Sequence, residues 1–459
     1  MVASGHEQSP IRVLATAFAA VPGSSPQGAS MMSMVDGLRA DLDLVTVKTE
    51  DLAHTKRMGD ARMFRVPVGS APLPEQREAY GRAVRRQLEA EPYRVVHAFD
   101  PWAGAIAAEH PAPGRLLVYE VSSFPEHADA EGWIEAHRAT LAAADRVWVP
   151  TLAMAAALSE RGLESRVDVV RPGVDVSRFD WMEPTPPSTP RLLYLGGFGP
   201  SRDLETLLLA LEKVTALRPV RLMIAGDRAR ERRDALRERV TELGLEAIVT
   251  VRGEPHARRL PELIAAADVC VVPSLGAAIE GLVELPQPLL EPLSCARPVV
   301  AADVPGVSEL VRDEVEGLLH PAGNATALAD ALLEVMRDSV LRERLIRGGY
   351  RRVRDELTAG ARRRRVRALY EVLVPGSQRA DPWEESFDEI TGLFELNTGA
   401  LELLREGADT LAPPDIDTDE TRAPRARDEE TKPRAERPRR TDTDTHPGLV
   451  VPDTDPGRR

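Results

Sequence analysis

The chain of 459 residues has few cysteines, few aromatic residues and no long apolar run. Its two cysteines, Cys270 and Cys295, lie in apolar segments beside expected strands, so we predict buried thiols rather than a disulfide or metal ligands. No apolar run approaches the ~18 residues that a membrane span requires. The first residues, MVASGHEQSPIRVLATAF, lack the charged and then apolar pattern of a signal peptide, which predicts a cytoplasmic protein.

The chain also has no excess of positive charge. The net charge is −14 and the pI is about 5.3, which argues against general nucleic-acid binding because that function needs a basic surface. The hydrophobic content of 43% is enough for a packed interior. The length exceeds that of one ordinary α/β core, so we expect two domains.

Short apolar runs alternate with helical patterns along the first 182 residues. Strands interleaved with helices are typical of a doubly wound parallel sheet. We therefore predict an α/β, Rossmann-like domain over residues 1–182, with a polar helix over residues 74–88. Its expected strands cover residues 11–15, 42–47, 94–98, 116–121 and 146–150.

A Pro-rich segment, residues 183–190, predicts a linker, because proline removes hydrogen-bond donors and stiffens the chain. A second Rossmann-like domain is expected over residues 191–375. Residues 376–410 predict a short helical extension, and residues 411–459 have the composition of a disordered charged tail. The strands of the second domain are expected at residues 191–196, 220–225, 248–251, 269–272 and 298–301.

Residues 194–203, YLGGFGPSRD, join an expected strand to an expected helix. The glycines Gly196 and Gly197 allow backbone N–H groups to approach a phosphate, and the following helix adds a partial positive charge at its N-terminus. Arg202 could add a bidentate phosphate contact. An ordinary glycine-rich turn without a ligand is the alternative interpretation.

Glu291 lies where a short expected helix begins, in the segment PLLEPLSCARPVV between two expected strands. In open α/β sheets, ligands bind beyond the carboxyl ends of the strands, where helices begin. A carboxylate at that place can accept hydrogen bonds from the two hydroxyls of a ribose or another vicinal diol.

The same segment resembles the donor-site signature of retaining GT-B glycosyltransferases in the "glycosyl transferases group 1" family, which are GT4-like. The usual form of that signature is E-G-F-G-L-P-x-L-E-A-M-A-C-G-x-P-V-V. Glu291 matches its second glutamate. The first falls on Val283, with Glu284 one residue away and Glu280 three residues away in the other direction.

Other segments resemble the family in the same order along the chain. Against the pattern G-R-L-x-x-x-K-G, Gly197 stands in place of the arginine and Arg202 in place of the lysine. Residues 171–175 resemble P-N-G-V-D, which is mainly architectural. The remaining matches cover residues 225–228, which resemble V-G-D-G-P, and residues 252–256, which resemble F-x-G-x-V-P. By this resemblance, the donor would be bound by Gly196, Gly197, Arg202, Gly226, Asp227, Gly253, Glu284, Leu290 and Glu291.

Many relatives carry a histidine over the donor sugar, after a strand of the first domain. In this chain the matching position holds Ser122, while His127 lies a few residues further on and His97 ends the preceding expected strand. We keep all three as candidate catalytic residues. For each histidine, capping of a strand end is an equally good interpretation.

The resemblance implies a GT-B fold, with two doubly wound Rossmann-like domains facing a cleft and a largely disordered C-terminal extension. It also implies hexosyl transfer from a nucleotide-sugar to an unidentified glycan, lipid or small-molecule acceptor, with retention of configuration and without a cofactor or metal. The acidic pattern at residues 415–419 predicts no metal site, because no strand precedes it.

Two other functions remain open. A catalytically degenerate GT-B module could act as a binding or scaffold protein, and a GT-B sugar epimerase would show denser acid and base residues in the cleft. The basic run Arg362–Arg365 could contact anionic lipid on the inner membrane face. A solvated helix face that pairs with the acidic tail is the interpretation that we favour. The sequence predicts no oligomeric state.

Overall fold

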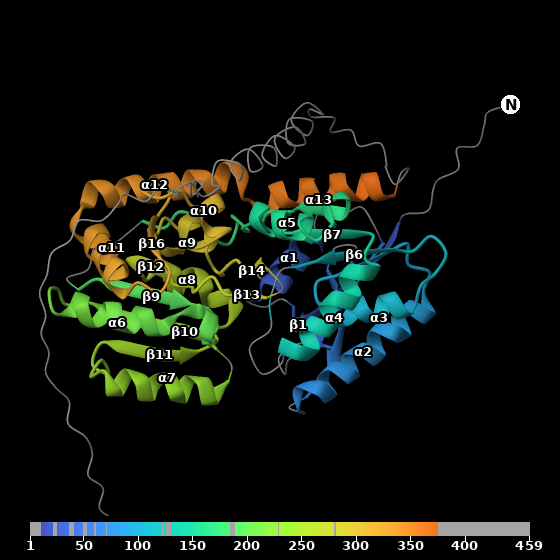
Figure 1. Cartoon of the computed structure of the whole chain (residues 1–459), viewed down its shortest axis with the longest axis horizontal. Coiled ribbons are helices and arrows are strands. Elements are labelled where there is room, and N and C mark those ends of the chain that lie inside the picture. The colour runs from blue at the N-terminus through green and yellow to red at the C-terminus, as the bar shows by residue number, and fades with distance from the viewer. Residues whose placement is uncertain are drawn as a thin grey trace, which may run out of the picture. The chain divides into compact units, whose positions relative to one another are not determined.

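A computed structural model of the chain describes residues 11–21, 25–35, 41–48, 53–58, 61–69, 71–121, 124, 130–183, 189–227, 229–279 and 281–374. All of them belong to one compact unit of the chain. They form two large sheets and a small hairpin, with helices on both faces of each large sheet (Figure 1). This is the predicted pair of doubly wound α/β lobes.

The first lobe is built on an eight-stranded sheet in the order β3-β4-β2-β1-β5-β6-β7-β8. All neighbours are parallel except β3 and β4, and Val13 at the centre lies opposite Leu42 on one side and Val95 on the other. The five expected strands are present, whereas β3, β4 and β8 were not predicted. The strands are β1 Arg12–Ala20, β2 Asp41–Lys48, β3 Thr55–Met58, β4 Ala61–Pro67, β5 Val95–Ala98, β6 Leu116–Glu120, β7 Arg146–Val149 and β8 Val167–Val169, and the helices are α1 Pro26–Val35, α2 Leu73–Ala90, α3 Pro101–Glu109, α4 Ala130–Ala143 and α5 Leu152–Ser159, with the 3-10 turn η2 Glu164–Arg166.

The second lobe is built on a six-stranded, all-parallel sheet in the order β11-β10-β9-β12-β15-β16. The five expected strands are again present, and β16 extends the sheet. Its strands are β9 Arg191–Leu195, β10 Arg221–Asp227, β11 Val249–Gly253, β12 Val269–Val272, β15 Val299–Asp303 and β16 Leu318–Pro321; its helices are α6 Leu204–Thr215, α7 Arg230–Glu242, α8 Leu260–Ala265, α9 Leu290–Ser294, α10 Val307–Leu310, α11 Ala325–Arg337 and α12 Ser339–Glu356, with the 3-10 turns η3 Pro200–Arg202 and η4 Ala257–Arg259.

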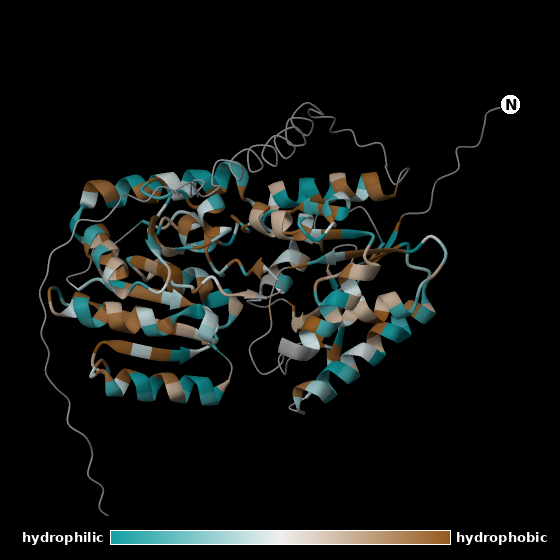
Figure 2. Cartoon of the chain, viewed as in Figure 1, coloured by the Kyte–Doolittle hydropathy of each residue, from teal (hydrophilic) through white to brown (hydrophobic). Residues whose placement is uncertain are grey.

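Apolar side chains fill the space between each sheet and its helices. On α6, Leu204, Leu207, Leu208 and Leu211 recur at helical spacing and are all buried. The hydropathy colouring in Figure 2 shows brown strands between helices whose outer surfaces are teal, most clearly on α2 and α7. The predicted buried thiols Cys270 and Cys295 are confirmed, since both are free and buried and burial raises the pKa of each to about 12.

The last described helix, α13 Ala359–Leu373, packs against the first lobe although it follows the second in sequence. Its residues Val366, Leu369 and Tyr370 are buried in the apolar cluster that contains Trp148 of β7. Figure 1 shows α13 beside α5 and β7. This last described helix therefore completes the core of the first lobe.

Two further contacts tie the lobes together. The hairpin formed by β13 Ala278–Ile279 and β14 Leu282–Val283 follows β12, yet Leu282 is fully buried in a core cluster of the first lobe. On α10, the carboxylate of Glu309 accepts hydrogen bonds from Leu152 N (2.7 Å) and Ala153 N (2.8 Å), which caps the N-terminus of α5.

Several predictions fall on residues outside the described part of the chain. These are the central linker residues 184–188, the expected extension at residues 376–410, and the tail at residues 411–459 with its acidic pattern at 415–419. None of the helices that the structure describes is long and apolar enough to cross a bilayer.

Candidate active site

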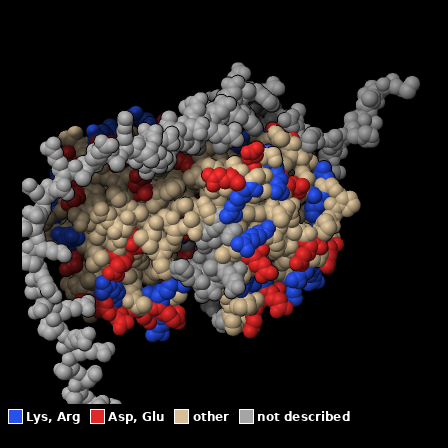
Figure 3. Space-filling model, viewed as in Figure 1, with Lys and Arg blue, Asp and Glu red and all other residues tan. Residues whose placement is uncertain are grey.

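A cavity of about 610 Å³ lies at the carboxyl ends of strands from both sheets. It is bounded by the end of β1 and by α1 from the first lobe, and by the turns that follow β9, β10 and β11 from the second lobe. This is where open α/β sheets bind ligands. Figure 3 shows acidic and basic side chains interspersed over the described part of the face it presents.

Two glycine turns of the second lobe form part of the cavity wall. Gly196 has φ 147° and Gly226 has φ 140°, a region that L side chains rarely adopt. A Cβ on Gly226 would lie 2.3 Å from the carbonyl oxygen of Gly196, so the two turns pack directly on each other. Gly197 lines the cavity beside them. Backbone atoms therefore form this part of the wall.

Asp227 holds the second turn in place. Its carboxylate accepts hydrogen bonds from Phe198 N (2.8 Å), Ala229 N (2.7 Å) and the Arg232 guanidinium (2.7 and 2.9 Å). Burial opposes ionisation, but Arg232 and the two N–H groups offset it and hold the pKa of Asp227 below its usual value. Asp227 lines the cavity as a fixed carboxylate that also positions Arg232.

Arg202 ends the 3-10 turn after β9 and lines the cavity. Its guanidinium donates to Glu284 Oε1 at 2.9 Å, and both side chains are mostly buried. Glu284 follows β14 of the hairpin anchored in the first lobe. The structure therefore brings together two residues that the sequence assigned separately to donor binding.

Glu291 lies in the first turn of α9, half-buried, and lines both this cavity and a smaller one of about 50 Å³ beside it. Its Oε2 is buried and has no hydrogen-bond partner among the described residues. Burial raises the pKa of Glu291, while its own backbone N–H, that of Leu290 and the charge of Arg178 oppose the rise. An unpaired buried carboxylate oxygen is a costly feature that a ligand hydroxyl would satisfy.

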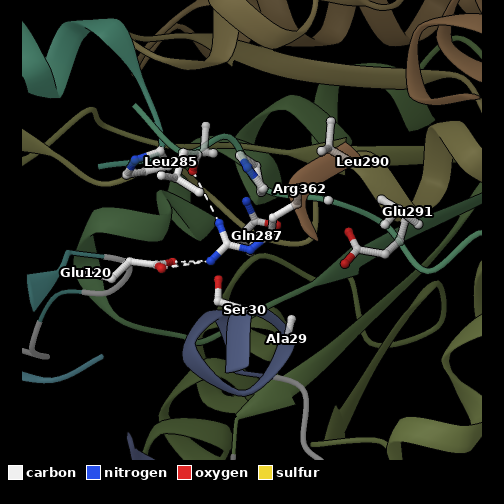
Figure 4. Close-up of a pocket in the computed structure, with 13 residues that line it drawn as sticks. Ala29, Ser30, Glu120, Leu285, Gln287, Leu290, Glu291 and Arg362 are labelled. Carbon is white, nitrogen blue, oxygen red and sulfur yellow. Dashed lines mark hydrogen bonds and ion pairs between the residues drawn. The ribbon is translucent and has the colours of Figure 1, made fainter. Parts of the chain in front are cut away.

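Figure 4 shows the smaller cavity, which adjoins the larger one at Gln287 and Glu291. Glu291 points from α9 towards the space beside Ser30 of α1. Leu290, predicted on the donor side, is buried and lines this smaller cavity. Gly253 ends β11 and does not line either cavity, whereas the next two residues, Glu254 and Pro255, line the larger one.

His97 lies in the core of the first lobe rather than in the lining of either cavity. It is fully buried, its Nδ1 is 2.8 Å from the Tyr370 hydroxyl, and its Nε2 is 3.4 Å from Glu120 Oε2. Burial lowers the pKa of His97. His97 is therefore a core residue that lines neither cavity. The other two candidates, Ser122 and His127, lie outside the described residues.

The basic run on α13 is not the solvated face that the sequence favoured. Arg362 is buried and donates from Nη2 to both carboxylate oxygens of Glu120 at 2.8 Å, and Arg365 is partly buried near Asp168. Arg364 alone is classed as exposed, and Arg363 lines the large cavity. The run was misjudged because composition does not reveal which neighbour each side of a helix contacts.

Three arginines of the cavity were missed by sequence reasoning: Arg178, Arg232 and Arg363. Arg232 could have been suspected, since it lies in the first turn of α7, which follows the Gly226–Asp227 turn. No sequence signal distinguished Arg363 from its basic neighbours. Among the described residues, no three His, Cys, Asp or Glu side chains gather closely enough to hold a metal ion.

Comparison with known sequences identifies both lobes. Residues 189–338 match the sequence profile described as "Glycosyl transferases group 1", and residues 24–173 match the one described as "Glycosyl transferase 4-like domain". The first match covers the second lobe from β9 to α11, and the second ends just beyond β8.

The curated relatives match part of the chain. It is 35% identical over 169 residues to phosphatidyl-myo-inositol mannosyltransferase of Mycobacterium leprae, covering 36% of this chain and 41% of that protein. It is 33% identical over 202 residues to D-inositol 3-phosphate glycosyltransferase of Nocardia farcinica, covering 41% and 43%. The matches span less than half the length of both relatives.

Solved structures match most of the fold. Sucrose-phosphate synthase from Thermosynechococcus elongatus superposes with a TM-score of 0.66 at 21% identity, covering 79% of this chain and 99% of that one. Anabaena HepE in complex with UDP and glucose gives 0.61 at 18% identity, covering 79% and 100%. At these identities the likeness establishes the fold alone, which is the GT-B arrangement.

Proposed function

The chain belongs to the glycosyl transferases group 1 family, and on that premise we propose that it transfers a hexose from a nucleotide-sugar to an acceptor hydroxyl with retention of configuration. The bond from the anomeric carbon to the diphosphate breaks, and a new bond to the acceptor oxygen forms on the same face of the sugar. The nucleoside diphosphate is the leaving group.

The observation that carries this proposal is the Oε2 atom of Glu291 in the cavity wall, which has no hydrogen-bond partner in the described part of the chain. A ribose presents two neighbouring hydroxyls, and a carboxylate can accept a hydrogen bond from each. The Anabaena HepE structure is in complex with UDP and glucose, which supports a nucleotide-sugar as the ligand class.

We assign the diphosphate to the turn formed by Gly196 and Gly197, together with Arg202. Backbone N–H groups of such a turn can approach phosphate oxygens without side-chain interference. Negative charge grows on the diphosphate as the sugar leaves, and fixed donors in a partly dry site stabilise that charge. Glu284, which accepts from Arg202 at 2.9 Å, would hold the guanidinium in position.

The first test is a ligand screen on the full chain. UDP, GDP and ADP are compared by thermal shift, because a ligand that binds the native state raises its melting temperature. We expect one of them to stabilise the chain, and Glu291→Gln to weaken that binding by about tenfold or more through loss of a charged hydrogen bond. Glu262→Gln, an exposed carboxylate on α8, is the matched control. If none of the nucleotides shifts the melting temperature, the donor assignment is wrong.

The second test measures release of nucleoside diphosphate from the matching nucleotide-sugars. Two relatives are named for inositol-containing substrates, so polyols with and without phosphate form the first acceptor panel. A binding module of the same fold would bind the nucleotide without releasing it from the sugar. Turnover that depends on Arg202 therefore separates the enzyme from the binding module.

A further inference from the structure

The two sides of the large cavity differ in charge. The second lobe contributes the charged side chains Arg202, Asp227, Arg232, Glu254 and Glu291, and the segment after β8 contributes Asp175 and Arg178. On the first-lobe side, β1 and α1 contribute uncharged residues such as Phe18, Ala20 and Met32, which are half-buried. Residues 13–35 contain no Asp, Glu, Lys or Arg, although 29% of the whole chain is charged.

Arg363 is the charged residue beside β1 and α1. It lines the cavity from α13, next to α1, where Arg362 Nε donates to Ser33 Oγ at 2.8 Å. Successive helical residues point about 100° apart, so Arg362 turns into the core and Arg363 towards the cavity. Among the described lining residues of β1, α1 and α13, Arg363 carries the only charge.

The start of α13 is held firmly beside the cavity. Val174 N donates to Leu357 O at 2.9 Å, and Ala359 N donates to Val174 O at 2.7 Å. A Cβ on Gly173 would lie 2.6 Å from Thr358 O, so the close approach of these two segments requires glycine at that position. Arg363 therefore projects from a fixed backbone.

The Arg363 guanidinium has no hydrogen-bond or ion-pair partner among the described residues. The other cavity arginines are engaged: Arg202 with Glu284, Arg232 with Asp227, and Arg178 with the carbonyl of Ala257 at 2.9 Å. Arg363 Nη2 lies 3.8 Å from where a Cβ on Gly360 would be, so the guanidinium reaches back over the first turn of α13. The positive end of the helix and the guanidinium thus reinforce each other.

We propose that Arg363 binds a phosphate group of a substrate in the cleft. The proposal rests on the proposed function, in which a diphosphate diester brings a negative charge on each phosphate. Position 197, where the family pattern has an arginine, holds a glycine, and Arg202 is already paired with a carboxylate. Arg363 is placed to supply a further cation for the ligand. The phosphate belongs either to the donor or to a phosphorylated acceptor.

The experiment compares Arg363→Gln with Arg364→Gln, its exposed neighbour on the same helix, in the full chain. Binding of UDP, GDP, ADP and inorganic pyrophosphate is measured by calorimetry, and KM is measured for matched acceptors with and without phosphate. Because Arg363 has no protein partner among the described residues, both variants should keep the melting temperature of the wild type.

Two outcomes support the proposal and identify the phosphate. A loss of about tenfold or more in nucleotide and pyrophosphate affinity, seen for Arg363→Gln alone, assigns it to the donor. The second outcome is an unchanged nucleotide affinity together with a rise of about tenfold or more in KM, seen for phosphorylated acceptors and not for the others. This outcome assigns the phosphate to the acceptor. Arg363→Lys should recover part of either loss, since it keeps the charge but not the planar fork.

The proposal is overturned if Arg363→Gln equals Arg364→Gln in every measurement. Failure of the proposed function looks different, because the wild-type chain would then bind none of the nucleotides. If pyrophosphate binding still depends on Arg363 in that case, Arg363 forms an anion site and the assignment of a nucleotide-sugar donor is wrong.

Discussion

At the scale of single residues, Glu291 shows how a binding site opposes stability. Its buried Oε2 lacks a partner among the described residues, and burial raises its pKa. The ionised form that a ribose needs is therefore the form that the empty protein disfavours. Stability and ligand affinity should respond to this residue with opposite signs.

We predict that Glu291→Gln stabilises the empty protein by about 1 kcal/mol at neutral pH, because it removes a poorly paired buried charge. The folded-state pKa is raised, so the wild type loses stability as pH rises above the ordinary carboxyl pKa through the folded value. The variant should lack this loss. Urea unfolding at several pH values measures it, with Glu262→Gln as the exposed control. A variant less stable than the wild type at every pH would contradict this account.

The arginines of the cavity show, also at the residue scale, that side chains of the same type differ in their partners. Arg202, Arg232 and Arg363 all line one cavity, but only the first two have carboxylate partners among the described residues. A carboxylate partner fixes the position of the Arg202 and Arg232 guanidinium groups, so the residue type alone does not tell how each cation is held.

At the scale of elements, α13 determines how the first lobe is completed. The sequence shows an amphipathic helix with four consecutive arginines. Packing then places Arg362 between β6 and α1, where it contacts Glu120 and Ser33. The Arg362 charge offsets the effect of burial and holds the pKa of Glu120 below its usual value.

We predict that Arg362→Ala destabilises the protein by about 3–5 kcal/mol, since it leaves the Glu120 carboxylate buried without its partner. Combining it with Glu120→Gln should recover part of the loss. The pKa of Glu120 is lowered in the folded state, so the stabilisation is present above the ordinary carboxyl pKa and is lost on acidification. Chemical denaturation measures each variant, with Arg364→Ala as the control. If Arg362→Ala and Arg364→Ala both change the free energy of unfolding by a similar small amount, the ion pair does not stabilise the protein.

At the scale of the whole molecule, two short elements are among those that make contacts between the lobes. Leu282 of the β13–β14 hairpin is buried in the first lobe, and Glu309 of α10 caps α5. The hairpin also leads to Glu284 and so to Arg202 in the cavity. The same hairpin therefore holds the lobes together and positions residues of the donor site.

We predict that Glu309→Ala lowers stability by about 1–2 kcal/mol and reduces the cooperativity between the lobes, because α5 loses its cap from the second lobe. Calorimetry should show a broadened or split transition where the wild type shows a single one. The exposed Glu343→Ala on α12 serves as the control. An unchanged single transition in Glu309→Ala would show that this cap does not couple the lobes.

The sequence by itself determined the two doubly wound lobes, the glycine turns and the start of the helix at Glu291. Those features depend on local hydrophobic periodicity and on backbone conformations that only glycine adopts readily, and both are written in neighbouring residues. The pairing of Arg202 with Glu284, although each was named, required residues that lie 82 positions apart.

Only the tertiary structure decided which contacts His97 and the α13 arginines make and how far each is buried. His97 lies near the end of β5, and Tyr370 and Glu120 contact it in the core. Arg362 and Arg363 are neighbours in sequence but contact different surroundings, because a helix turns its side chains towards whatever packs around it. Burial and charge pairing depend on contacts between distant segments, and the spacing of residues along the chain does not encode them.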